Sequence, residues 1–176
     1  MSNRESVLEQ LAANRIDLAI MGQVPEGLGL EATRFMDNPL VAIAPPDHPF
    51  VQKKKVSLRD LASEPFLVRE AGSGTRAAMT RFFAEKGLEL HTSMEMSSNE
   101  AIKQAVQAGL GLAILSLQTL EMERALGRLA VLNVEGFPIM RHWYIVHRAD
   151  KRLSPAARAF NNFVLDEAAS FMKARP

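Results

Sequence analysis

Hydrophobic and polar positions along the chain repeat with two periods, one helical and one typical of buried strands. Residues 2–15 place their apolar side chains on one helical stripe, and the segment IDLAIMG at residues 16–22 follows as a buried strand. Two more extended segments follow at residues 30–38 and 39–45, and prolines then interrupt the pattern at residues 45–49. We therefore expect one helix and three strands in the first part of the chain.

Strand and helix patterns alternate in the middle of the chain and are joined by short connections. Such alternation predicts a parallel sheet with right-handed crossovers. The predicted strands are residues 66–69, 92–96, 112–116 and 129–134, and the predicted helices are residues 75–86, 98–108 and 120–126.

The end of the chain predicts a long strand at residues 141–148 and a last helix that begins at Ser154 and Pro155. This helix carries one apolar stripe, which must pack against something. The first part of the chain has too few helices to cover both faces of its strands, so we expect the last helix to return there. The stripe consists of Phe160, Phe163, Val164, Ala168 and Phe171.

Two lobes follow from this arrangement. We expect a discontinuous lobe I formed by residues 1–45 and 148–176, and a lobe II formed by residues 46–147. The chain then passes between the lobes twice, near residues 44–47 and near residues 147–150.

Composition removes several classes of function. The 176 residues are 47% hydrophobic, which is enough for a core, and 21 Lys+Arg against 20 Asp+Glu leave a net charge of +1, too little for direct nucleic-acid binding. Without cysteine there are no disulfides or thiolate metal sites, and the four histidines form no ligand pair. No apolar segment has the length of a membrane span, and the first residues do not resemble a secretory signal, so we expect a cytoplasmic protein.

One turn, at the end of a predicted strand, could hold an anion. Arginine in the first turn of a helix faces the positive end of the helix dipole, which costs about 0.3 to 1 kcal/mol unless an anion lies there. Glycines let the backbone approach a ligand, and hydroxyls and amide N–H groups can bind its negative charge. Alternatively the turn is only a cap, and the arginine pairs with Glu70. The residues of this first corner are Gly72, Ser73, Gly74, Thr75 and Arg76.

A second corner precedes the predicted helix at residues 98–108. Ser97 and Glu100 have the spacing of a capping box, which is a structural device, and this reading leaves Asn99 unassigned. A third corner, Gly22 and Gln23, follows the first predicted strand and is a candidate only because of its location.

The sequence gives little support for a catalytic function. The turn around Ser73 does not match the G-x-S-x-G nucleophile elbow, and it lacks the lysine and the spacing of a phosphate-binding P-loop. A hydrolase that uses Ser73 remains an alternative, and it predicts turnover that Ser73→Ala abolishes. We expect no enzyme, no metal and no cofactor.

Several segments together resemble the effector-binding domain of LysR-type transcriptional regulators. They are LAANRIDLAIMG, PDHPF, FLVREAGSGTRAAMTRFFAEKG, MEMSSNEAIKQAVQAGLGLAILS and SPAARAFNNFVL, in that order along nearly the whole chain. The segments R-E-x-G-S-G-T-R and S-N-E-x-I-K-Q-A-V resemble more narrowly the branch that regulates the RuBisCO (Calvin-cycle) operon.

This resemblance implies an α/β fold of the type-II periplasmic-binding-protein kind, with two Rossmann-like lobes and a small effector in the cleft between them. It also implies a cytoplasmic regulator without catalytic activity, whose effector domains form homodimers within tetramers. Signals of this branch are sugar phosphates, phosphorylated acids and NADPH. A solute-binding receptor of a transport system shares the fold and remains the alternative function.

The family places a winged helix-turn-helix domain and a strand–loop–helix–strand unit ahead of the segment that matches NRESV. Because this chain begins there, we expect lobe I to be N-terminally truncated and DNA to be bound only through a domain absent from the chain. The predicted effector-binding residues are Gly72, Ser73, Gly74, Thr75, Arg76, Ser98, Asn99 and Glu100 in lobe II, and Asn3, Arg4, Gly22 and Gln23 in lobe I.

Overall fold

The structure is a computed structural model that describes residues 4–25 and 27–173. The chain divides into two compact units. Unit 1 takes the chain up to Asn38 and again from Arg141 onward, and unit 2 is Pro39–Met140. Each unit has its own sheet.

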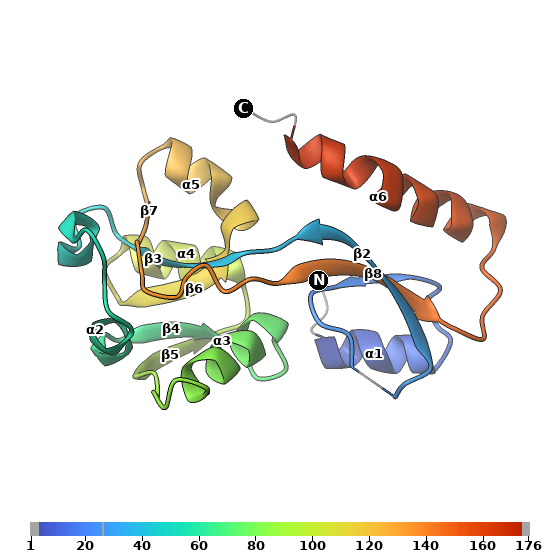
Figure 1. The fold of residues 1–176 in the computed structure, drawn as a ribbon, viewed down its shortest axis with the longest axis horizontal. Coiled ribbons are helices and arrows are strands. Elements are labelled where there is room, and N and C mark those ends of the chain that lie inside the picture. The colour runs from blue at the N-terminus through green and yellow to red at the C-terminus, as the bar shows by residue number, and fades with distance from the viewer. Residues whose placement is uncertain (1–3, 26, 174–176) are drawn as a thin grey trace. The chain divides into compact units, whose positions relative to one another are not determined.

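Unit 1 contains a three-stranded antiparallel sheet in the order β1-β8-β2. Helix α1 packs against β1 and β8, whereas α6 contacts β2, and the two helices lie on opposite sides of the sheet (Figure 1). The elements of unit 1 are α1 (Arg4–Ala12), β1 (Ala19–Met21), β2 (Leu30–Asp37), β8 (His142–Arg148) and α6 (Pro155–Lys173).

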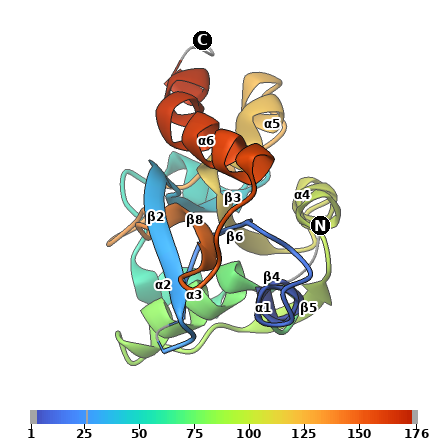
Figure 2. The same ribbon diagram turned by 90° about the vertical axis from the view of Figure 1, so that its right-hand side faces the viewer.

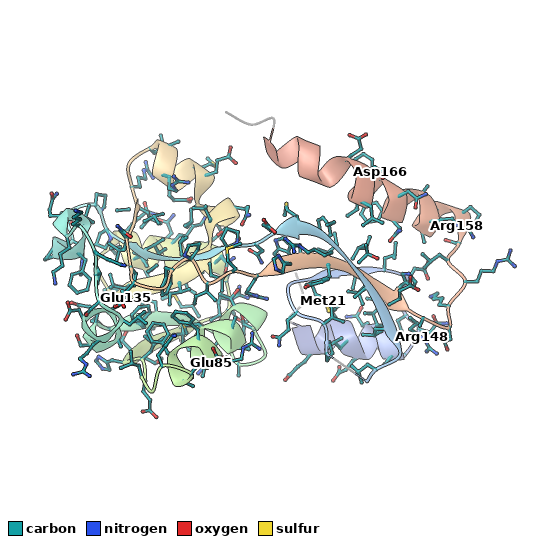
Figure 3. The ribbon with its side chains drawn as sticks, viewed as in Figure 1. Met21, Glu85, Glu135, Arg148, Arg158 and Asp166 are labelled. Carbon is teal, nitrogen blue, oxygen red and sulfur yellow. The ribbon has the colours of Figure 1, made fainter. Side chains whose placement is uncertain are left out.

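Alternation along the strands of unit 1 separates the two faces of its sheet. Ala19 and Met21 are buried in one cluster with Leu11 of α1 and Val146 of β8, and Met21 is labelled in Figure 3. Ile20, between Ala19 and Met21, projects from the other face and is exposed. One apolar cluster of unit 1 therefore lies between α1 and the sheet.

The last helix begins as the sequence predicts, because the Ser154 hydroxyl accepts a hydrogen bond of 3.2 Å from the amide of Ala157. Its apolar stripe is only partly buried. Val164 is buried, whereas Phe160 and Phe163 are both half-exposed. Ala168 and Phe171, the other members of the predicted stripe, have side chains outside the described part of the structure.

Unit 2 contains a five-stranded mixed sheet in the order β5-β4-β6-β3-β7. Its strands are β3 (Leu40–Ala44), β4 (Phe66–Arg69), β5 (Thr92–Met96), β6 (Leu112–Ser116) and β7 (Ala130–Val131). Its helices are α2 (Leu58–Ser63), α3 (Gly74–Ala84), α4 (Asn99–Gln107) and α5 (Glu121–Ala125), with 3-10 turns η1 (Pro49–Gln52) and η2 (Leu117–Leu120).

Helices α3 and α4 cover opposite faces of the β4 strand, a separation that can be followed in Figure 2. Phe66 and Val68 pack in one cluster with Met79 of α3, whereas Leu67, which points the other way, packs with Ile102 of α4. Strands β3 and β6 are buried along their whole length, as expected of strands covered on both faces.

The prediction of a purely parallel sheet is wrong for part of unit 2. Strand β4 is parallel to β5 and to β6, but β3 is antiparallel to both β6 and β7. The parallel pairs are those joined through α3 and α4, which carry the chain back to the same end of the sheet. Strand β3 has no such crossover helix before it.

The division into units also differs from the expected boundaries at residues 45/46 and 147/148. The chain passes from unit 1 to unit 2 between Asn38 and Pro39, and returns between Met140 and Arg141. The physical reason is strand pairing, because β3 pairs with β6 and β7 in unit 2, whereas β8 pairs with β1 and β2 in unit 1.

Candidate functional site

The ends of β4 and β5 bring two helix N-termini to one edge of the unit 2 sheet. Arg69 at the end of β4 is in register with Met96 at the end of β5, and the amide of Glu70 donates to the Met96 carbonyl at 3.1 Å. Each strand is followed by a short turn and a helix, α3 or α4. The unpaired N–H groups at a helix start favour negative charge, so this edge has the character of an anion site.

The first turn, at the start of α3, holds the predicted residues 72–75. Gly72 has a φ of +82°, which favours glycine, and the amide of Ser73 donates to the Glu70 carbonyl at 3.2 Å. Ser73 is the N-cap residue, only 6% exposed, yet its hydroxyl makes no capping hydrogen bond. Ser73 thus stands at the N-cap position, but its side chain does not cap the first amides of α3.

The second turn, at the start of α4, is capped by a different serine than predicted. The hydroxyl of Ser98, not that of Ser97, accepts a hydrogen bond of 3.0 Å from the amide of Ala101. The capping box of Ser97 and Glu100 is therefore wrong, because the helix begins one residue later than that motif requires. The Glu100 carboxylate pairs with Lys103 at 2.8 Å instead.

Arg69 connects the two turns and was not predicted. Its guanidinium donates two hydrogen bonds to the Glu70 carboxylate, at 2.7 and 2.9 Å, and a third to Oδ1 of Asn99 at 2.6 Å. Hydrogen bonding from Arg69 also holds the pKa of Glu70 below its ordinary value, so this carboxylate stays ionised. The sequence contained one signal, since alternation in β4 places Arg69 on the same face as Leu67, toward α4.

Arg76 does not pair with Glu70, so that alternative is wrong. Its guanidinium forms an ion pair with Glu95 of β5 and donates to the Arg69 carbonyl at 3.2 Å. The side chain lies on the α3 face of the sheet, beside a cavity of about 330 Å³ that Met79, Phe83 and other residues line. Arg76 and Arg69 thus approach the end of β4 from opposite faces.

A buried lysine on α4 holds this helix to the chain that follows β6. The ammonium of Lys103 is paired with Glu100 and Glu123, both at 2.8 Å, and donates to the Thr119 carbonyl at 3.1 Å. Burial acts to lower the pKa of Lys103, but the hydrogen bonds to the two carboxylates outweigh it and raise this pKa above the ordinary value. The network fixes the first turn of α4 relative to α5.

The predicted residues of the first lobe lie in unit 1. Gly22 directly follows β1 and is next to Gln23, whereas Arg4 is the first residue of α1, and Asn3 lies outside the described residues. A Cβ atom at Gly22 would stand 2.2 Å from Nη2 of Arg141, so this glycine makes room for an arginine that the sequence did not single out.

Comparison with known proteins decides the family. The family model of the LysR substrate binding domain matches residues 1–169. The chain belongs to this family.

Relatives of the LysR-type chain include two close regulators. It is 55% identical over 169 residues to the RuBisCO operon transcriptional regulator of Allochromatium vinosum, covering 96% of this chain and 56% of that protein. It is 49% identical over 172 residues to the HTH-type transcriptional activator CmpR of Synechocystis, covering 97% and 57%. The chain thus spans little more than half the length of these curated relatives.

Solved structures agree with this family. The regulatory domain of CcmR from Synechocystis PCC6803, in complex with 2-PG, superposes with a TM-score of 0.89 at 37% identity, covering 99% of this chain and 82% of that one. The effector binding domain of QuiR, in complex with shikimate, has a TM-score of 0.82 over 93% of this chain and 77% of that one. At 22% identity, the second likeness supports the fold alone.

These comparisons confirm the LysR-type resemblance and the periplasmic-binding-protein-like α/β fold expected from the sequence. The chain is an effector-binding domain of the LysR type, and the relatives reported above are regulators, not transport receptors. Among the described residues, no helix is both long and apolar enough to cross a membrane. The same part of the chain gathers no group of three metal-binding side chains.

Proposed function

We propose that this chain senses a small phosphorylated metabolite for a LysR-type regulator of RuBisCO and Calvin-cycle genes. The observation that carries the proposal is the pair of helix N-termini at the end of β4, connected by Arg69 through Glu70 and Asn99. Its gene target rests on the relatives, which include a RuBisCO operon regulator at 55% identity.

The preference for an anion comes from the backbone more than from side-chain charge. Arg69 is already matched by Glu70, so the side-chain charges of this pair balance. The amides at the starts of α3 and α4 add a partial positive charge, of about half an elementary charge at each helix start. Glycine at positions 72 and 74 lets a phosphate approach these amides without a Cβ in its path.

We propose Gly72, Ser73, Gly74 and Thr75 as the residues that bind the phosphate, with Ser98 and Asn99 at the second turn. Arg76 and Glu100 belong to the predicted set, but their charged groups are paired with Glu95 and Lys103, and we assign them to positioning the two turns. Arg4, Gly22 and Gln23 in unit 1 stay proposals from the sequence.

The effector class is a small phosphorylated acid. The CcmR domain, 37% identical to this chain, was solved with 2-PG, which makes 2-phosphoglycolate the first candidate. Sugar phosphates and NADPH are the other candidates. No cofactor or catalytic step is part of the proposal.

The domain acts in transcription because effector binding changes the arrangement of the full-length regulator. In the full-length protein, we propose a cytoplasmic homodimer within a tetramer, with DNA bound by a separate winged helix-turn-helix domain. The effector shifts this assembly only by the difference between its affinities for two arrangements, so tight binding alone has no regulatory effect.

A ligand screen tests the proposal. The melting temperature is recorded with 2-phosphoglycolate, sugar phosphates, phosphoenolpyruvate and NADPH, because a ligand that binds only the native state raises it. We expect a shift with at least one phosphorylated acid and none with the matched compound that lacks the phosphate, such as glycolate. Equal shifts with glycolate and 2-phosphoglycolate would contradict phosphate recognition.

A further inference from the structure

Unit 2 has a cavity that has no role in the proposed effector site. It lies on the α3 face of the sheet, between α3, the segment at residues 88–90 and the strands β4 and β5. Its volume is about 330 Å³. Small-molecule sites in proteins have volumes of about 300 to 1,000 Å³, so this cavity is large enough for a small ligand.

The floor of the cavity is apolar and belongs to the core of the unit. Val68 of β4 and Met79 and Phe83 of α3 are each at most 4% exposed. Leu88 and Leu90 also line the cavity and pack against the same core cluster. Packed core side chains hold defined rotamers, so the floor is preformed, and the Met79 sulfur and the Phe83 ring favour an aromatic or branched alkyl group.

The arginine beside this cavity is already matched by a carboxylate. Arg76 forms an ion pair with Glu95 and donates a hydrogen bond of 3.2 Å to the Arg69 carbonyl. The Glu95 carboxylate would repel an acid that approached this guanidinium, because like charges brought together at a binding site disfavour the ligand. The charges of Arg76 and Glu95 thus balance, and this part of the cavity does not favour an anion.

Negative charge is left uncompensated near the other end of α3. Glu89 lines the cavity and is exposed, and its carboxylate has no ion pair or hydrogen bond within the described part of the chain. Ala84, the last residue of α3, lines the cavity too, where the helix dipole adds about half an elementary negative charge. The nearest basic residues in sequence, Arg81 and Lys86, do not line the cavity. Its lining therefore favours a cation.

We infer that this cavity binds a small hydrophobic amine, with the ammonium at Glu89 and an aromatic or branched alkyl body on Met79 and Phe83. Thr80 and Thr92 also line the cavity, and their hydroxyls can accept hydrogen bonds from an ammonium. The inference goes beyond the proposed function, because the ligand is a cation and not a phosphorylated acid. It also uses the α3 face of the sheet, not the amides at the starts of α3 and α4.

Titrations followed by two-dimensional ¹H–¹⁵N spectra test the inference, with 2-phenylethylamine as the probe. The neutral 2-phenylethanol and the anionic 3-phenylpropionate carry the same ring and serve as comparisons. We expect the amine to bind about two- to fivefold more tightly than the alcohol, which is the contribution of an exposed ion pair. The propionate should bind more weakly than both, and the amide shifts should be largest at Thr80, Ala84 and Thr92.

Two variants of exposed residues locate the site without altering the core. Glu89→Gln should weaken binding of the amine about two- to fivefold and leave binding of the alcohol unchanged. Ala84→Leu places a larger side chain in the cavity and should abolish binding of both compounds. The matched control is Glu85→Gln, because Glu85, labelled in Figure 3, is an exposed carboxylate near the end of α3 that does not line the cavity. It should bind the amine as the wild type does.

Three results would overturn the inference. They are equal affinities for the amine and the alcohol, wild-type affinity for the amine in Glu89→Gln, and tighter binding of 3-phenylpropionate than of the amine. The last result would assign the cavity to acids held by Arg76. The proposed function stands or fails separately, since it depends on 2-phosphoglycolate, whose affinity should be the same in Glu89→Gln and the wild type.

Discussion

Arg69 and Asn99 are thirty positions apart in the chain, yet Nη1 of the arginine donates a hydrogen bond of 2.6 Å to Oδ1 of the asparagine. This contact joins the end of β4 to the first turn of α4. Arg69 also binds Glu70 with two further hydrogen bonds, so one guanidinium organises both turns of the candidate site.

Arg69→Ala should therefore impair effector binding strongly. It removes the donor to Asn99 and leaves the Glu70 carboxylate unpaired beside the anion site, so we expect the dissociation constant of 2-phosphoglycolate to rise about tenfold or more. Arg59→Ala, an exposed arginine of α2 at the other end of β4, is the control and should bind as the wild type does. If calorimetry finds that Arg69→Ala binds 2-phosphoglycolate with the wild-type affinity, Arg69 does not organise the binding site.

Removing Glu70 together with Arg69 refines that prediction. The double variant Arg69→Ala with Glu70→Ala lacks the unpaired carboxylate, so part of the lost affinity should return. An affinity below that of Arg69→Ala would mean that Glu70 does not repel the ligand.

Arg76→Ala should change affinity much less than Arg69→Ala. The Arg76 guanidinium is engaged with Glu95, and with side chains 31% and 50% exposed, solvent screens this pair. Such pairs contribute about 0 to 1 kcal/mol to stability, so Arg76→Ala and Glu95→Ala should both lower the free energy of unfolding by about 1 kcal/mol at most. Urea titration measures this change in stability. If Arg76→Ala loses as much affinity for the effector as Arg69→Ala does, Arg76 is a ligand-binding residue.

Lys103→Met should destabilise the domain. The lysine side chain is 6% exposed, and its removal leaves the Glu123 carboxylate without its ion-pair partner. One oxygen of this carboxylate is already buried without a hydrogen bond. Breaking a buried pair by removing one partner costs about 3 to 5 kcal/mol. Urea unfolding measures the loss, and Glu100→Gln, which changes the more exposed partner, should cost about 1 kcal/mol or less. Equal stabilities for these two variants would show that the network has no structural role.

Low pH should reduce the stability of the domain through protonation of Glu70 and Glu123. Hydrogen bonds from Arg69 and Lys103 lower the pKa values of these two carboxyls below the ordinary 4.5. A carboxyl with a lowered folded-state pKa contributes stability above its unfolded pKa and loses it as the pH falls through the folded value. Unfolding free energy should thus fall as the pH drops below about 4.5, and Glu123→Gln should flatten this decline. A decline as steep as that of the wild type would exclude Glu123 as a contributor.

Much of unit 2 could be predicted because its signals are local. Strands β4, β5 and β6 and helices α3 and α4 lie where alternation and helical period put them, and each depends on neighbouring residues. The short helix α2 was missed because six residues give too little periodicity, although Ser57 caps it. The antiparallel pairing of β3 was missed because strand direction depends on the route of the chain, not on the residues of the strand.

The candidate site was predicted in part for the same reason. The glycine turn and the start of α4 are visible in the sequence, because caps and positive φ angles have local signatures. Arg69 and the place of Arg141 beside Gly22 were missed, since they follow from strand register and from packing. Capping by Ser98 in place of Ser97 depended on a shift of one residue in the helix start, finer than periodicity resolves.

Amide chemical shifts test the central claim most directly. In two-dimensional ¹H–¹⁵N spectra recorded during titration with 2-phosphoglycolate, the amides of Gly74, Thr75 and Asn99 should show the largest changes in unit 2, because they donate to the bound phosphate. Saturable binding that leaves these three amides unshifted would contradict the claim that the helix starts beside β4 hold the effector.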